Sequence, residues 1–284
     1  MSGLRLAWIK FSRDRLAFSG FLIIFSLILV AIFAGVLAPY PEDTFSIHPS
    51  ARLQPPSLTN FLGTDSMGRD IFSRLLFGAR VTLIISIIAV GTSLLIGVPL
   101  GLIAGYSENW LSELIMRIAD VFLSIPQIIL AILLAQSLGP SIANVILALS
   151  ITYWPWFTRI VFAETRTLRQ TVFIEATEAL GANPLRTTVL HVLPNVSSSI
   201  IVRSSIGMGY TILTAAVLGF LGVGAQPPIP EWGVTIAESR QYLPEAWWYA
   251  TFPGLAIFLV VMGFNMFGDG LRDILDPRIR RGFE

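Results

Sequence analysis

The residues from 171 to 195 form a polar, helix-patterned segment in a chain that is otherwise mostly apolar. Within 172–180 one face of a 3.6-residue repeat carries the apolar residues Val172, Phe173, Ala176, Ala179 and Leu180, and the other carries Glu175, Thr177 and Glu178. Gly181 follows, and glycine commonly ends a helix in the left-handed conformation. The Asn-Pro pair at 183–184 is typical of a helix start, so a second short helix is predicted that ends at the Leu-Pro pair at 193–194. Two amphipathic helices joined at a glycine offer non-covalent docking, either on a protein partner or on the membrane surface.

Two ionisable side chains are expected in or at the edge of membrane-spanning segments. Arg203 lies seven residues past the expected start of its span, about 10 Å deep at a rise of ~1.5 Å per residue. Asp120 opens another span from the same side. An unpaired charge there costs at least about 2.5 kcal/mol, so Asp120 and Arg203 are expected to pair. The alternative pairs Asp120 with Arg117 on its own helix and lets Arg203 extend to the lipid headgroups.

The residue patterns that indicate an enzyme are missing. The chain has no cysteine, which excludes a thiol nucleophile and a Cys-based metal site. Its two histidines, His48 and His191, are far apart, and no Gly-x-Ser-x-Gly or His-Glu-x-x-His motif is present. Its single lysine, Lys10, is not part of a Walker A phosphate-binding loop. If ATP drives this protein, another subunit must bind the nucleotide.

The composition is that of a membrane protein. Hydrophobic residues make up 54% of the 284 residues, charged residues 13%, and the mean hydropathy is +0.72. Six stretches are each apolar enough, and about long enough, for the ~20 residues that cross a bilayer. These predicted spans are residues 17–39, 82–104, 121–138, 141–158, 196–222 and 246–268. The first is longer than the apolar core of a signal peptide, so an uncleaved span is expected.

Basic residues divide unequally between the alternating loops. With the N-terminus inside, 13 of the 19 lysines and arginines lie in cytoplasmic segments and five in outer segments, as the positive-inside rule requires. The predicted organisation is a cytoplasmic segment 1–16, a six-span domain 17–268 and a cytoplasmic tail 269–284. The outer loops are then 40–81 and 223–245, and the polar segment belongs to the cytoplasmic loop 159–195. The helical part of 40–81 is expected to lie along the outer membrane face.

Small and aromatic residues inside the spans suggest packing roles. Glycines four residues apart on the second span predict close contact with a neighbouring helix; they are Gly97, Gly101 and Gly105. Trp154 and Trp156 are interpreted as interfacial anchors. Polar groups in the spans, among them Gln127 and Tyr210, fit buried interhelical hydrogen bonds and the lining of a polar path equally well.

Several of these segments resemble ABC-importer permeases. The run Glu175-Ala176-Thr177, then Gly181 and Leu193-Pro194, is similar to the "EAA" loop of that family, with Thr177 in place of an alanine and His191 in place of an isoleucine. Other motifs resemble the dipeptide/oligopeptide/nickel branch more specifically, in particular its second, "C-type" permease subunit. These are Leu62-Gly63-Thr64-Asp65, Gly68-Arg69-Asp70, Glu231-Trp232-Gly233 and residues 268–277. The resemblance covers residues 60–278, most of the chain.

The resemblance implies an all-α membrane protein of six transmembrane helices, with the type I ABC importer permease fold and a cytoplasmic coupling helix. Glu175, Ala176 and Gly181 would dock on an ATPase, as the polar contact, the close packing contact and the elbow respectively. The implied partners are a second homologous permease, two ATPase subunits that bind ATP and Mg, an extracytoplasmic binding protein and membrane lipid, but no nucleic acid. The chain itself is expected to bind no cofactor and no metal.

The implied function is ATP-driven import of di- or oligopeptides across a bacterial inner membrane, with Asp120 and Arg203 as a possible inner-gate pair. Nickel import is an alternative within the same branch, although no predicted span contains a histidine, a common ligand of transition metals. An ATP-independent channel or secondary transporter is the third possibility. The substrate-binding residues stay unknown at this stage.

Overall fold

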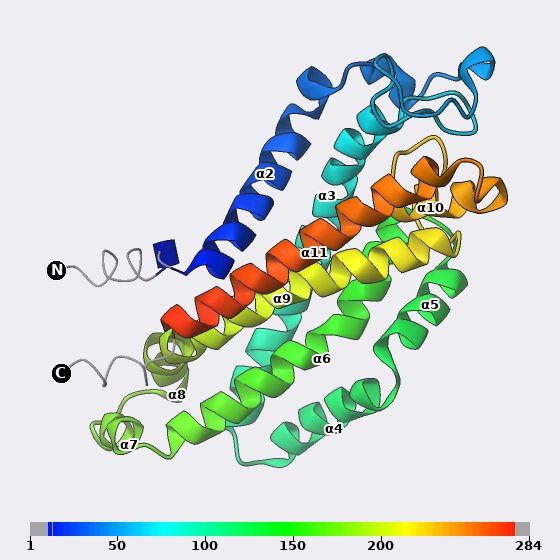
Figure 1. Cartoon of the computed structure of the whole chain (residues 1–284). Coiled ribbons are helices and arrows are strands. Elements are labelled where there is room, and N and C mark those ends of the chain that lie inside the picture. The colour runs from blue at the N-terminus through cyan, green and yellow to red at the C-terminus, as the bar shows by residue number, and fades with distance from the viewer. Residues whose placement is uncertain (1–10, 13, 276–284) are drawn as a thin grey trace.

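The computed structural model describes residues 11–12 and 14–275, and the regular elements found there are all helical. The long helices are α2 (Arg15–Leu37), α3 (Ile71–Tyr106), α6 (Ile142–Arg169), α9 (Leu193–Phe220) and α11 (Trp247–Leu275). The shorter ones are α4 (Trp110–Ser124), α5 (Gln127–Leu138), α7 (Val172–Ala179), α8 (Pro184–Thr187) and α10 (Trp232–Ser239). Figure 1 shows α7 and α8 at one end of the long helices, and α10 with the loop between α2 and α3 at the other. We call these the α7 end and the α10 end.

The long helices match the predicted spans, with one exception. Five helices are long and apolar enough to cross a membrane, and a sixth span results if α4 and α5, which are bent by 89°, count as one. The prediction of a single span over 121–138 is therefore wrong in shape, because the helix breaks at Ile125 and Pro126. Proline disfavours helical geometry in the residue before it, and Ile125 is accordingly extended, with φ −94° and ψ 132°.

Two further boundaries differ from the expectation. Helix α3 begins at Ile71, capped by the Asp70 carboxylate, so residues 71–81 extend the second span instead of lying along the membrane face. The second short helix does not end at Leu193, because a π-helical turn η3 (Thr188–Val192) joins α8 to α9. The Leu193 N–H donates to the Thr188 carbonyl, five residues back, so the chain passes into α9 without a break.

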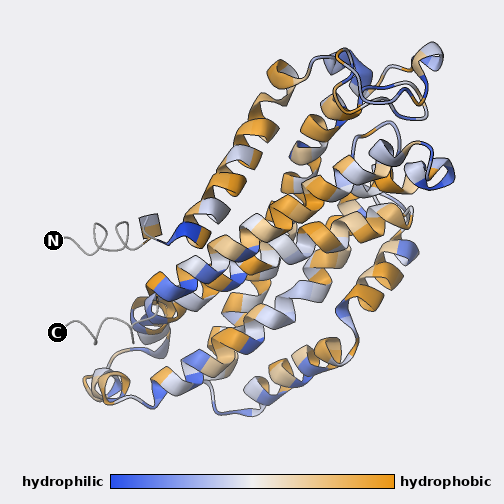
Figure 2. Ribbon diagram, viewed as in Figure 1, coloured by the Kyte–Doolittle hydropathy of each residue, from blue (hydrophilic) through white to orange (hydrophobic). Residues whose placement is uncertain are grey.

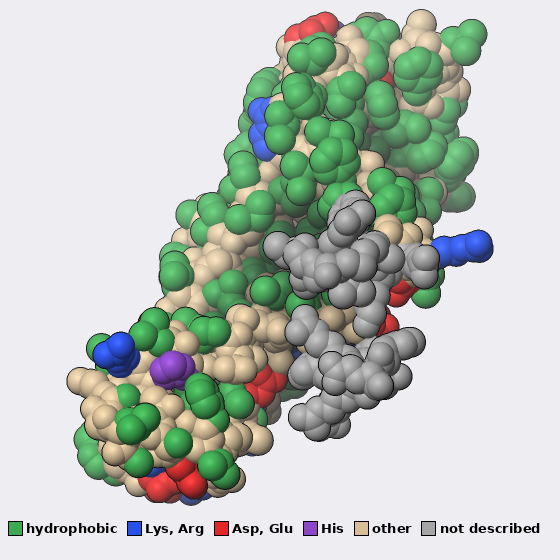
Figure 3. Space-filling view, turned by 90° about the vertical axis from the view of Figure 1, so that its left-hand side faces the viewer, with side chains coloured by type: hydrophobic (Ala, Val, Ile, Leu, Met, Phe, Trp, Pro, Cys, Tyr) green, Lys and Arg blue, Asp and Glu red, His purple; other side chains and the backbone are tan. Residues whose placement is uncertain are grey.

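The predicted chain ends are only partly visible. Helix α11 continues past the expected boundary at residue 268 as far as Leu275. The rest of the expected tail, and residues 1–10 and 13 of the expected N-terminal segment, lie outside the described residues. Between the two ends of the molecule, apolar side chains face outward over most of the helical surface (Figures 2 and 3). Such a surface is suited to lipid or to an apolar partner.

The glycine stripe on α3 has the role predicted from its spacing, because it packs directly against α6. The Thr158 hydroxyl of α6 donates to the Gly97 carbonyl of α3 at 3.1 Å, which requires the two backbones to approach closely. Further along, the Ser93 hydroxyl donates to the Ser150 carbonyl at 3.2 Å. These contacts join α3 and α6 into one rigid pair at the centre of the molecule.

Substitution within this stripe should be costly. A Cβ atom at Gly101 would lie 2.7 Å from the Val161 Cβ atom and 2.8 Å from the Thr158 carbonyl oxygen, so Gly101→Ala should force α3 and α6 apart and destabilise the protein by about 1–3 kcal/mol. Gly91→Ala on the same helix is the matched control, because its Cβ would meet nothing within 4 Å. Thermal unfolding in detergent should show a lower midpoint for Gly101→Ala alone; equal midpoints would contradict this packing.

Candidate functional site

The segment that carries α7 and α8 has the elbow predicted from its sequence. Gly181 has a φ of +83°, the left-handed region that favours glycine. The Asn183 side chain accepts a hydrogen bond from the Leu185 N–H at 2.9 Å, and Pro184 occupies the first turn of α8. The chain thus turns sharply between two short helices. We call residues 171–192 the α7–α8 element.

One apolar residue fixes the α7–α8 element to the rest of the protein. Ile174 is 1% exposed and belongs to a core cluster with Leu102 of α3, Val161 of α6 and Val196 of α9. The sequence pattern did not single out Ile174, because it lies apart from the apolar face of α7. The available signal was an apolar residue on the face of α7 that also carries Thr177 and Glu178, three and four residues further on. Through Ile174, α7 contacts three long helices together.

A polar contact holds α7 on the same face, because Glu178 lies four residues after Ile174. The Tyr106 hydroxyl at the end of α3 donates to the Glu178 carboxylate of α7. Arg169 at the end of α6 stacks over the Tyr106 ring at 5.3 Å and pairs with Glu108 at 3.3 Å. Any displacement of α7 is therefore transmitted to the ends of α3 and α6.

The outer face of the α7–α8 element is apolar and uncovered. Its exposed apolar side chains are Val172, Phe173, Leu180, Leu185, Val189 and Leu190. Leu180 is 89% exposed, although burying a leucine side chain is favourable by about 1.5–3 kcal/mol. Glu175 and Ala176 are exposed beside it, and the Glu175 carboxylate has no ion-pair or hydrogen-bond partner among the described residues. A surface of this kind is suited to a groove on another protein.

The expected pair between Asp120 and Arg203 is not formed. Asp120 of α4 pairs instead with Arg159 of α6, at 2.5 Å between Oδ1 and Nη1. The alternative pairing with Arg117 is also wrong, because Arg117 contacts Glu113 at 3.3 Å. The predicted pairing assumed a straight span from residue 121 to 138. The chain instead bends by 89° between α4 and α5, so α4, which carries Asp120, has a different direction from the one assumed.

Arg203 has an aromatic partner in place of an acidic one. Its guanidinium carbon lies 4.4 Å from the centre of the Trp156 ring, a cation–π contact. The Trp156 indole N–H donates to the Gln127 side-chain oxygen at 3.0 Å. Trp156, which the sequence suggested as an interfacial anchor, thus connects α6 to α5 and α9.

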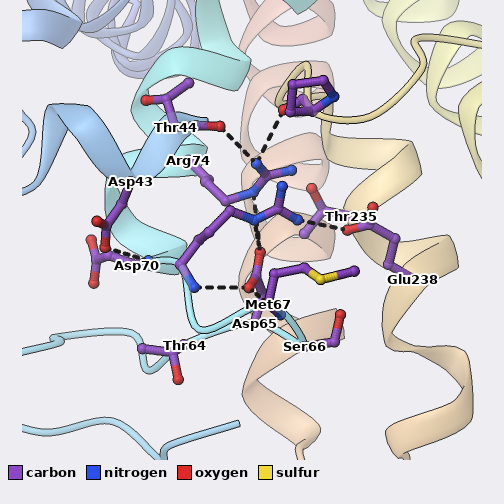
Figure 4. Close-up of polar contacts among 12 residues, drawn as sticks. Asp43, Thr44, Thr64, Asp65, Ser66, Met67, Asp70, Arg74, Thr235 and Glu238 are labelled. Atoms are coloured by element: carbon purple, nitrogen blue, oxygen red, sulfur yellow. Dashed lines mark hydrogen bonds and ion pairs between the residues drawn. The ribbon is translucent and has the colours of Figure 1, made fainter. Parts of the chain in front are cut away.

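At the α10 end, Asp65 is the centre of a buried ionic network (Figure 4). The side chain is 0% exposed, and its Oδ1 atom accepts hydrogen bonds from the backbone N–H groups of Met67 at 2.8 Å and Arg69 at 2.9 Å. Its Oδ2 atom lies 2.6 Å from Arg69 Nε and 3.5 Å from Arg74 Nε. One carboxylate therefore compensates two buried guanidinium groups.

The network also ties separate segments together. Arg69 reaches Glu238 of α10 at 3.5 Å, and the Tyr249 hydroxyl of α11 donates to the same carboxylate at 2.8 Å. Arg74 of α3 donates to the carbonyl oxygens of Thr44 at 3.2 Å and Pro228 at 3.3 Å. The Gly-Thr-Asp and Gly-Arg-Asp motifs of the loop between α2 and α3 thus have a structural role: they fix this loop onto α3, α10 and α11.

The Glu-Trp-Gly motif before α10 has a similar role. Glu231 is buried and caps α10, accepting from Gly233 N–H at 3.0 Å and Val234 N–H at 2.8 Å. Burial raises the pKa of the Glu231 carboxyl to about 7, although both hydrogen bonds act in the opposite direction. The Trp232 indole N–H donates to the Leu75 carbonyl of α3 at 3.1 Å. The α10 end is thus a preformed, rigid surface.

A multi-span helical body with an anchored amphipathic element, whose apolar face is exposed, is typical of a membrane subunit that works with other proteins. Residues 97–281 match the family described as "Binding-protein-dependent transport system inner membrane component", and residues 2–56 match the "N-terminal TM domain of oligopeptide transport permease C". The chain belongs to the family of binding-protein-dependent transport system inner membrane components.

Individual relatives agree with this assignment. The chain is 47% identical over 278 residues to the dipeptide transport system permease protein DppC of Alkalihalophilus pseudofirmus, covering 97% of this chain and 90% of the relative. It is 44% identical over 273 residues to the glutathione transport system permease protein GsiD of Pectobacterium atrosepticum, covering 96% and 90%. A chain of the inward-facing MetNI methionine ABC transporter has the same fold, with a TM-score of 0.59, 20% identity and coverage of 72% of this chain and 96% of that one. The fold is accordingly that of a type I ABC importer permease.

Proposed function

We propose that this chain is a transmembrane permease subunit of an ATP-driven importer of di- or oligopeptides. Its relatives include permeases of dipeptide and glutathione transport systems, and glutathione is itself a tripeptide. The observation that carries the proposal is the α7–α8 element, whose apolar outer face is uncovered while its inner face is anchored to three long helices. Because the chain lacks a Walker A motif, a separate ATPase subunit would have to bind the nucleotide. The exposed apolar face of the α7–α8 element is the surface on which that subunit would dock.

The arrangement suggests how force reaches the membrane region. An ATPase groove would receive the apolar face of α7, with Glu175 as a polar contact and Ala176 as the point of closest packing. Gly181 sets the angle between α7 and α8, so that both contact the groove. When the ATPase subunits close on ATP and Mg, Ile174 and the contact between Tyr106 and Glu178 would carry the movement into α3, α6 and α9. Packed helices shift as units, so a small displacement can switch the side to which the pathway opens.

The proposal also orients the protein. The α7 end would face the cytoplasm, where the ATPase subunits are, which agrees with the excess of lysine and arginine in the loops assigned there. The α10 end, fixed by its buried ionic network, would receive the extracytoplasmic binding protein. A second, homologous permease and a pair of ATPase subunits would complete an assembly in a bacterial inner membrane.

Isolation of the native assembly tests this function. Purified in mild detergent, the chain should bring with it an ATPase and a second permease, and in proteoliposomes the assembly should take up a labelled dipeptide only with ATP and the binding protein. Recovery of the chain without an ATPase, or uptake that continues without ATP, would rule the proposal out. Uptake of nickel instead of peptide would correct the substrate alone.

A further inference from the structure

Arg203 is a cation inside a membrane-spanning helix that has no acidic partner. It is the eleventh residue of α9, roughly 15 Å from the start of that helix at ~1.5 Å per residue. Among the described residues, no carboxylate forms an ion pair with it, and Asp120, the partner expected from the sequence, pairs with Arg159 at 2.5 Å. A charge at such depth is unfavourable unless it is compensated, so this guanidinium is suited to an anionic ligand.

The contacts of Arg203 leave its hydrogen-bond donors free. Its guanidinium lies over the Trp156 ring at 4.4 Å, and such stacking occupies the flat face of the group while its N–H groups point outward in the plane. None of these N–H groups has an acceptor in the part of the chain that the structure describes. The Trp156 indole N–H is hydrogen-bonded to the Gln127 side-chain oxygen at 3.0 Å, which fixes the ring against which the guanidinium lies.

A second donor without a partner lies at the same place. The Gln127 side-chain nitrogen is buried and has no hydrogen-bond acceptor. Gln127 is the first residue of α5, directly after the break that separates α5 from α4. The N-terminus of a helix carries a partial positive charge, and interrupted helices in transporters commonly direct such ends at an anionic substrate group. Arg203 and Gln127, which both contact Trp156, thus each keep N–H groups without an acceptor among the described residues.

Aromatic rings continue the site along α9. Tyr153 of α6 and Tyr210 of α9 are stacked, with ring centres 6.0 Å apart and planes at 14°. Gly207 leaves room for this pair, because a Cβ atom there would lie 2.7 Å from the Tyr153 ring. Positions 203, 207 and 210 share one face of α9, so the guanidinium and the stacked rings lie on the same side of the helix. Tyr153 is 2% exposed, so the partly buried Tyr210 is the ring of this pair that offers surface beside the charge.

We infer that Arg203 binds the C-terminal carboxylate of a peptide in transit, with Trp156 and Gln127 as positioning residues. The inference rests on the proposed function and adds a substrate contact to it. A carboxylate is the anionic group that every unmodified peptide carries, whatever its side chains, and Arg203 can hold it through paired N–H donors. The accessible parts of the Trp156 and Tyr210 rings would supply contacts that do not depend on side-chain sequence.

Transport of a tripeptide and of its C-terminal amide by the complete assembly tests this inference. Both peptides are delivered in proteoliposomes by the same binding protein at saturating concentration, so its own preference is the same for every permease variant. Arg203→Gln should lower uptake of the free acid about tenfold and leave uptake of the amide unchanged, because one charge-assisted contact is lost. Arg203→Lys should retain part of the preference for the acid, since the charge remains.

The control is Arg166→Gln, which removes an arginine that also stacks on a ring of its own chain, Phe162 at 5.9 Å, outside this site. It should leave the ratio of acid to amide uptake unchanged. An equal loss for both peptides in Arg203→Gln would overturn the inference and assign Arg203 a structural role. If that loss appears only with anionic lipids, Arg203 holds a lipid phosphate instead. Failure of the unaltered assembly to transport either peptide would overturn the peptide substrate of the proposed function, and the inference with it.

Discussion

Leu180→Asp is expected to leave the protein folded in the membrane but to lower the amount of co-purifying ATPase, and the rate of uptake, at least about tenfold. Leu180 is 89% exposed, so its replacement removes no contact within this chain. In the proposed complex the same side chain would be buried in the ATPase, where loss of a leucine costs about 1.5–3 kcal/mol and an unpaired carboxylate adds to the cost. The measurement is the ratio of ATPase to permease after purification in mild detergent.

Leu58→Asp is the matched control for this experiment. Leu58 is 93% exposed and belongs to the loop between α2 and α3, at the α10 end. The same substitution there should leave the ratio of ATPase to permease unchanged. Normal ATPase recovery with Leu180→Asp, or an equal loss with both variants, would show that the apolar face of the α7–α8 element is not the docking surface.

Asp65→Ala is expected to destabilise the protein by about 3–5 kcal/mol, because it leaves the buried Arg69 and Arg74 without their shared carboxylate. Both guanidinium groups are almost fully buried, so water cannot replace the lost partner. Asp65→Asn should be milder, since its side-chain oxygen can still accept hydrogen bonds from the backbone of Met67 and Arg69. The measurement is the midpoint of thermal unfolding of the purified protein, together with its level in the membrane.

An exposed ion pair provides the comparison. Glu113→Ala removes the pair with Arg117 at 3.3 Å, whose side chains are both largely exposed, and should cost less than about 1 kcal/mol. Similar unfolding midpoints for Asp65→Ala and Glu113→Ala would mean that the network at the α10 end does not stabilise the fold.

Local backbone conformation was predictable from the sequence where a particular residue type strongly favours one conformation. The elbow at Gly181 and the start of α8 at Asn183 were predicted because few other residues adopt those conformations or cap a helix as well. The close packing of Gly101 and its neighbours against another helix followed from their spacing of four, although the spacing did not identify that helix as α6. The membrane spans followed from length and apolarity alone.

Contacts between distant segments were not predictable in the same way. The pairing of Asp120 depended on the direction of α4, which the break before Pro126 changed, and Arg159 became the nearer cation. Ile174 anchors α7 because of where α3 and α9 lie, a property of the assembled fold that the periodicity of α7 does not contain. The outer motif around Asp65 was recognisable as a pattern, but its role as a buried network required the neighbouring α10 and α11.

The most direct test of the central claim uses the absence of cysteine from this chain. Leu180→Cys places a single thiol on the apolar face of the α7–α8 element, at a side chain that is exposed in the isolated chain. In membranes that contain the whole assembly, a short bifunctional thiol reagent should cross-link this cysteine to an ATPase subunit that carries a cysteine in its docking groove, and ATP should change the yield. Labelling of the cysteine from outside intact cells by a membrane-impermeant reagent, or the absence of any cross-link to the ATPase, would contradict the account.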